Sequence, residues 1–139
     1  MRLFYWFLET FPTPRRVRER RVRIRARREV QASEWAHRHF PNEMKRAARC
    51  VALALCEVEQ IDTATFEPTS RLVKDLRMTD LEPVEMVMLL EKDFGIRIPD
   101  SDAERLETVS EWVRYIYDRA FSHAEQKEGA TRGGTTRDE

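Results

Sequence analysis

The side chains that could support catalysis or bind a metal are few and scattered along the chain. The sequence has two cysteines, Cys50 and Cys56, and three histidines, His37, His39 and His123. Six residues apart on a helix, the cysteines would lie about 240° apart around its axis, so we expect no disulfide between them. No Cys-x-x-Cys pair, Gly-rich phosphate loop, Ser/His/Asp set or Cys/His pair is visible. We therefore expect neither an enzyme nor a metal site.

One acidic residue stands where binding chemistry is possible, at the predicted start of a helix. Apolar spacing predicts a helix from about Asp80 to Phe94, and Gly95 would end it in the left-handed conformation. Free backbone N–H groups and the helix dipole favour negative charge at the start of a helix. Asp80 is therefore predicted to cap this helix. The residues expected to face inward are Leu81, Val84, Val87, Leu90 or Met88, and Phe94.

Other helices must position this site. A first core helix is predicted from Glu43, after a break at Pro41 and a cap at Asn42, with apolar residues at spacings of three and four. A long loop, 61–75, follows and is pinned by Ile61, Phe66, Leu72 and Leu76. A short helical piece is expected at 102–106. Thr108 and Glu111 then form the pattern of a capping box, which starts a last helix reaching about Ala120. The predicted fold class is all-α.

The first forty residues differ in composition from the rest. Nine arginines and two glutamates lie within residues 15–30, a net charge of +7. Their spacing fits both strand and helix periods, and we favour helix. The arginines are Arg15, Arg16, Arg18, Arg20, Arg21, Arg23, Arg25, Arg27 and Arg28.

This basic tract has several possible roles. Residues 15–28 could hold an anionic membrane or nucleic acid, and the aromatic residues Phe4, Tyr5, Trp6 and Phe7 favour a membrane anchor. The tract could also fold back onto the chain's own acidic helix. Alternatively, it is a solvated tail, or the start codon has been placed too far upstream.

Net charge is zero over the 139 residues, but it is unevenly distributed. Residues 1–56 carry +9 and residues 57–118 carry −9. The mean hydropathy of −0.66 is typical of soluble chains. The apolar run at residues 3–8 is too short for a signal peptide or a membrane span. We expect a cytoplasmic monomer.

The order and spacing of several short motifs resemble the acyl carrier protein family over residues 42–120. The matching pieces are Leu72-Val73-Lys74-Asp75-Leu76, the helix ending Phe94-Gly95-Ile96, Ile98-Pro99-Asp100, and Leu106-Glu107-Thr108-Val109. The resemblance implies a small four-helix bundle with a long loop between its first and second helices. Residues 1–41 would be a basic extension and residues 121–139 a disordered polar tail.

The resemblance also implies a site that this sequence alters. In the family, an Asp-Ser-Leu motif carries 4′-phosphopantetheine on its serine, whereas this chain has Thr79-Asp80-Leu81. Arg77 stands where family members usually have glycine, and Pro83 stands where a small or polar residue is usual. The resemblance therefore implies Asp80 at the former attachment point, with no phosphopantetheine expected.

The family docks its enzymes through the second helix. The corresponding candidates here are Leu81, Glu82, Val84, Glu85, Met88 and Glu91, which would face a basic surface of a partner enzyme. The resulting hypothesis is a carrier-like domain that docks partners without a phosphopantetheine arm. One alternative is a divergent carrier in fatty-acid, lipid or polyketide-type biosynthesis. Another is a membrane- or nucleic-acid-binding adaptor that uses the Arg-rich tract.

Overall fold

The computed structural model describes residues 14–79 and 81–131, with side chains from Arg18 to Thr79 and from Leu81 to Phe121. Asp80 and the aromatic residues 4–7 lie outside this part of the chain. Within it there are helices and no strand, as predicted for an all-α fold. The elements are α2 (Pro14–His39), η1 (Asn42–Met44), α3 (Lys45–Glu59), η2 (Thr63–Thr65), α4 (Glu82–Phe94), α5 (Asp100–Ala103) and α6 (Val109–Thr131).

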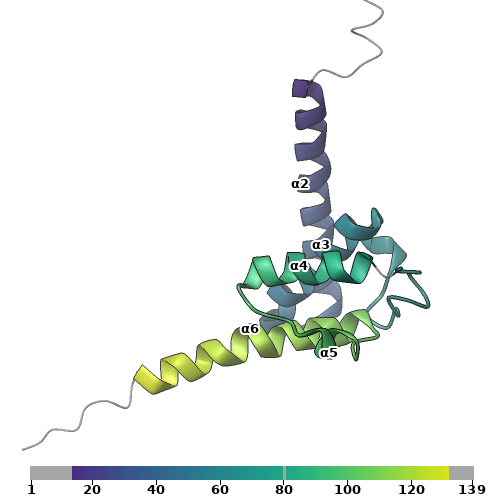
Figure 1. Ribbon diagram of the computed structural model, residues 1–139. Helices are drawn as coiled ribbons and strands as arrows, with labels where there is room; N and C mark the ends of the chain where they lie inside the picture. Colours follow the sequence, from purple (N-terminus) through teal and green to yellow (C-terminus); the bar gives the residue numbers. More distant parts are fainter. Residues whose placement is uncertain (1–13, 80, 132–139) are drawn as a thin grey trace, which may run out of the picture.

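Helix α3 lies at the centre of a small bundle and packs against α2, α4 and α6 (Figure 1). Its buried side chains include four alanines, which let the neighbouring helices approach closely. Val51, Leu55 and Cys56 fill the space between them, and none of the three is exposed to solvent. The pattern of apolar residues predicted this helix correctly, although η1 leads into it and Asn42 provides no side-chain cap.

Helix α2 confirms that the basic tract is helical, and it has two different halves. Its first half projects away from the bundle (Figure 1), whereas its second half packs on α3 through Ala32, Trp35 and Ala36, all buried. The Trp35 indole also donates a hydrogen bond of 3.2 Å to the carbonyl oxygen of Phe66. The predicted extension at residues 1–41 therefore contributes part of the core. The tract does not fold back onto the acidic helix, since residues 18–27 are exposed.

The register of α4 differs from the prediction. Met86 and Leu90 are its fully buried residues, while Val87 and Phe94 are partly buried. Leu81, Val84 and Met88 are exposed instead of facing inward. The sequence was compatible with several choices of inward face, because nearly every position from 83 to 90 is apolar. Packing against α3 selects the face that carries Met86 and Leu90.

Buried side chains hold the long loop on the core, and backbone hydrogen bonds join it to the start of the last helix. The buried side chains of Phe66, Leu72 and Met78 pin the loop to the core, and the Leu72 amide donates to the Glu107 carbonyl oxygen (2.9 Å) just before α6. The predicted short helix after Pro99 is present as α5, slightly earlier than expected.

Helix α6 begins as predicted and ends later. Thr108 and Glu111 form the capping box: the Glu111 amide donates to Thr108 Oγ1 (3.2 Å), and the Thr108 amide donates to Glu111 Oε2 (3.1 Å). The helix continues to Thr131, beyond the predicted end near Ala120. Phe121, which the sequence assigned to a disordered tail, packs on Phe94 and Tyr117 with ring centroids 6.1 and 5.6 Å away.

None of the helices within the described part of the chain is long and apolar enough to cross a membrane.

Candidate docking face at the start of helix α4

The chain entering α4 is held by a contact between Thr79 and Glu82. The Thr79 amide donates to Glu82 Oε2 (2.8 Å), and its hydroxyl donates to the same oxygen. This hydroxyl hydrogen bond lowers the pKa of Glu82 below its ordinary value. Leu81 occupies the N-cap position and cannot cap with its side chain, while Pro83 lies in the first turn, where a proline costs no helical hydrogen bond. The predicted capping role of Asp80 falls outside the described residues.

Arg77 turns the chain just before this helix. Its φ of 56° lies in the left-handed region, which glycine enters at little cost and other residues enter with strain. The resemblance implied a glycine at this position, and the backbone here has the conformation that suits one. Arg77 therefore adopts the backbone conformation that suits a glycine, although the residue is an arginine.

An apolar strip runs along the outer side of α4. Leu81, Val84 and Met88 are 72%, 56% and 66% exposed, at spacings that place them on one helical face. By the same geometry Glu85 and Glu91 lie on either side of the strip. We call these five residues together with Glu82 the α4 docking face. Of the six predicted docking residues, Leu81, Val84, Glu85 and Met88 are exposed, while Glu82 and Glu91 are partly buried.

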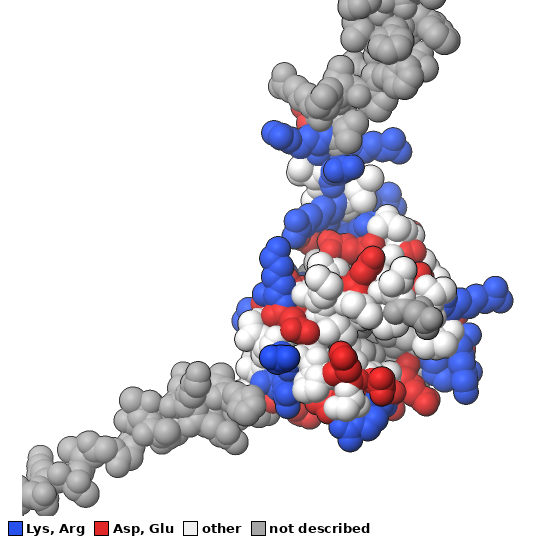
Figure 2. All heavy atoms as spheres, viewed as in Figure 1, with Lys and Arg blue, Asp and Glu red and all other residues white. Residues whose placement is uncertain are grey.

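Charge is divided between the bundle and the projecting helix. Acidic and uncharged side chains fill the centre of the bundle face that carries α4, with Lys and Arg at its rim, whereas Lys and Arg side chains line α2 (Figure 2). Near the docking face, burial raises the pKa of Glu59 and the charge of Glu82 adds to this effect. The carboxylates of Glu59 and Glu82 are thus close enough to repel each other where α3 ends and α4 begins.

A cavity of about 600 Å³ opens beside the docking face. Val84, Met88 and Glu91 form one wall of the cavity. The loop that precedes α4 forms a second wall, α5 forms a third, and Trp112 of α6 also lines the cavity. The Trp112 indole Nε1 is buried and has no hydrogen-bond partner among the described residues. No pattern in the sequence predicts this cavity, because the cavity depends on how far α4 stands from α5 and α6.

A polar contact ties α5 to α6 at the edge of the cavity. The Tyr115 hydroxyl donates to Asp102 Oδ2 (2.7 Å), and Arg105 forms an ion pair with Asp102 Oδ1 (2.6 Å). Both contacts lower the pKa of Asp102, the one with Tyr115 more than the one with Arg105. These residues fix the position of α5 without adding a reactive group.

The two thiols are unsuited to act as nucleophiles. Burial raises the pKa of the Cys56 thiol to about 11, and burial followed by the charge of Asp93 raises that of Cys50. Both therefore hold their protons near neutral pH, and a protonated thiol is a poor nucleophile. Among the described residues no group of three potential ligands could hold a metal ion.

Comparison with known proteins identifies the family of this bundle. Residues 51–116 match the family model described as "Phosphopantetheine attachment site". The acyl carrier protein of Helicobacter pylori (strain G27) is 38% identical over 72 residues, which are 52% of this chain and 92% of that protein. The acyl carrier protein of Helicobacter hepaticus is 41% identical over 66 residues, 48% of this chain and 87% of that protein.

The chain belongs to the acyl carrier protein family. Members of this family are carriers and not catalysts, as the sequence predicted for this chain. The family-model match runs from within α3 to within α6, so α2 lies outside it.

The residues at the start of α4 do not fit the prosthetic group of acyl carrier proteins. Attachment needs a serine hydroxyl at this terminus, and between Arg71 and Asp100 the only Ser or Thr in the sequence is Thr79. That hydroxyl is hydrogen-bonded to Glu82. The neighbouring Asp80 offers a carboxylate, which cannot form the same phosphodiester.

Sequence reasoning missed two groups that support the site. Ala32, Trp35 and Ala36 anchor α2 and, through Trp35, the loop that leads to α4. Their spacing of three and four was a signal for a buried face that the neighbouring arginines obscured. Met86 was missed because the adjacent apolar residues fit the same period equally well.

Proposed function

We propose that this protein is an acyl-carrier-like domain that binds partner enzymes through the α4 docking face without carrying a phosphopantetheine arm. The observation that carries the proposal is the exposed strip of Leu81, Val84 and Met88 beside a helix start that lacks an available serine. An exposed apolar strip flanked by carboxylates suits a partner with an apolar centre and a basic rim. The built-in carboxylate of Asp80 supplies negative charge where a phosphate would otherwise stand.

The attachment half of this proposal is tested by intact mass. The chain is co-expressed with a broad-specificity phosphopantetheinyl transferase and analysed by mass spectrometry. We expect the unmodified mass, and a gain of one phosphopantetheine would overturn the proposal. The Asp80→Ser variant is expected to gain that mass if Asp80 alone blocks attachment.

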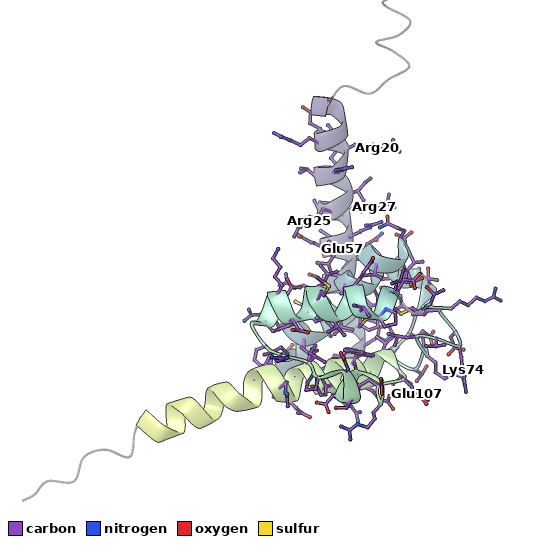
Figure 3. The ribbon with its side chains drawn as sticks, in the orientation of Figure 1. Arg20, Arg25, Arg27, Glu57, Lys74 and Glu107 are labelled. Atoms are coloured by element: carbon purple, nitrogen blue, oxygen red, sulfur yellow. The ribbon has the colours of Figure 1, made fainter. Side chains whose placement is uncertain are left out.

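The docking half is tested by competition, with the same transferase as the probe. The chain is added at increasing concentration to a reaction in which the transferase modifies an ordinary acyl carrier protein. We expect inhibition by the chain and about tenfold weaker inhibition by Glu85→Lys, the loss of about 1.4 kcal/mol of binding. Glu107→Lys makes the same charge change away from the docking face, at the exposed residue marked in Figure 3, and is expected to inhibit like the parent chain. Equal weakening by both variants would mean that the docking face is not used.

A second candidate is a divergent carrier of fatty-acid, lipid or polyketide-type assembly that is modified by an unusual route. The cavity of about 600 Å³ beside α4 favours it, because a carrier needs space near its attachment point for the attached chain. Modification of the parent chain when it is isolated from its native cells would support this candidate over the first.

A further inference from the structure

The projecting half of α2 has no counterpart in the matched family segment, and its described side chains are mostly exposed. Over residues 18–28 it carries seven arginines and one glutamate, Glu19. Six of the arginines are exposed, and the seventh, Arg28, is partly buried and donates to Gln60 (2.9 Å) where α2 meets the bundle. We call residues 18–28 the Arg arm. Its eleven residues extend for about 16 Å.

The arginines of the arm form two rows. Arg18, Arg21 and Arg25 repeat at spacings of three and four, as do Arg20, Arg23 and Arg27. By helical geometry the rows lie about 160° apart around the axis. Figure 3 agrees: the Arg25 side chain lies on one side of α2, and Arg20 and Arg27 lie on the other. The arm therefore presents guanidinium groups in two nearly opposite directions.

A narrow strip of small apolar residues separates the rows on one side. Val22, Ala26 and Val30 repeat every four residues, and Val22 and Val30 are 63% and 58% exposed. Glu19 lies in line with this strip, about one turn before Val22. Glu29 borders the strip and forms an ion pair with Arg25 (3.4 Å). The strip is too narrow and too close to carboxylates to bury a helix in a bilayer surface, which needs a broad apolar face.

We propose that the Arg arm binds double-stranded DNA by lying in the major groove. The groove is wide enough to admit one α-helix, with a phosphate backbone on each side. The two arginine rows would each face one backbone, and Val22 and Ala26 would face the base edges, where small apolar side chains contact thymine methyl groups. Arginine suits this role because its guanidinium binds phosphate oxygens in pairs.

The geometry of the bundle is compatible with this placement. The side of α2 that docks on α3 carries Ala32, Trp35 and Ala36, about 110° around the axis from the strip of Val22 and Ala26. The bundle therefore stays outside the groove. Acidic side chains of the bundle lie next to the base of the arm (Figure 2), so it is the projecting part of the arm, beyond them, that is placed to meet phosphate.

Binding of the full chain to a fluorescent 20-base-pair DNA duplex, followed by anisotropy between 50 and 200 mM salt, tests the proposal. With about six phosphate contacts, the affinity should fall about a thousandfold across this range, a logarithmic slope of about −5. The triple variants R18Q/R21Q/R25Q and R20Q/R23Q/R27Q should each reduce the magnitude of that slope by about 3. Circular dichroism of each variant checks that the exposed substitutions leave the helices folded.

A matched control removes the same charge elsewhere. Lys74, Arg97 and Arg114 are exposed on the bundle, and changing all three to Gln should leave the slope as it is. A slope near zero for the parent chain, or an equal effect of the control, would overturn the proposal. An effect of only one row would overturn groove insertion, and tighter binding to a duplex RNA or to phosphatidylserine vesicles would assign the arm to that ligand instead.

Discussion

Helices α4 and α6 lie in the same bundle but begin in different ways. At α6, Thr108 and Glu111 each accept the other's backbone N–H, so the first turn is capped by its own sequence. At α4 the N-cap position is held by Leu81, and the Thr79–Glu82 contact fastens the preceding chain to the helix. The start of α6 is therefore built for stability. The start of α4 instead exposes Leu81, the residue that follows Asp80 at the serine position of the family motif.

Removing the cap of α6 should have the largest effect on stability. Thr108→Ala deletes the hydroxyl that accepts the Glu111 amide, and the loss of such a cap costs about 1 kcal/mol, up to about 2. Urea denaturation followed by circular dichroism measures this change. Thr69→Ala, an exposed threonine in a turn, serves as the control and should change stability by less than about 0.5 kcal/mol. Equal effects of the two variants would mean that the cap contributes nothing of its own.

Adding a cap to α4 should have a somewhat smaller and opposite effect. Leu81→Asn places a neutral capping side chain at the N-cap position and is expected to raise stability by up to about 1 kcal/mol. Asparagine avoids another carboxylate beside Asp80 and Glu82. The same substitution at Val73, which is also exposed but starts no helix, should bring no gain. If Leu81→Asn destabilises the protein, the leucine has a role in the fold that its exposure does not suggest.

The smallest expected effect is on titration. Because the hydrogen bond from Thr79 lowers the pKa of Glu82, this carboxylate stabilises the fold above its ordinary pKa, and the contribution disappears as the pH falls through the lowered value. Thr79→Val should raise the pKa of Glu82 toward the ordinary glutamate value and weaken this acid dependence. NMR titration of the Glu82 carboxyl carbon measures it, with Thr69→Val as the control. An unchanged titration curve would show that the hydroxyl does not hold Glu82 in solution.

The sequence predicted well those features that depend on neighbouring residues. The α6 capping box, the Gly95 terminus with φ of 60° and the amphipathic pattern of α3 all follow from local spacing. The inward face of α4 did not, because its apolar residues surround most of the helix and only packing selects Met86 and Leu90. The docking residues were predicted from the family resemblance. Their exposure, and the cavity beside them, required the arrangement of the helices.

The packing of Trp35 makes the folded domain larger than the segment shared with relatives. The family match begins at residue 51, but Trp35 is only 3% exposed and binds the Phe66 carbonyl oxygen. A fragment trimmed to the family boundary would uncover the side of α3 that Ala32 and Ala36 protect and would leave Phe66 without its aromatic neighbour. Such a fragment would expose an apolar surface that is buried in the intact domain. Work on the carrier domain in isolation therefore needs the second half of α2 as part of that domain.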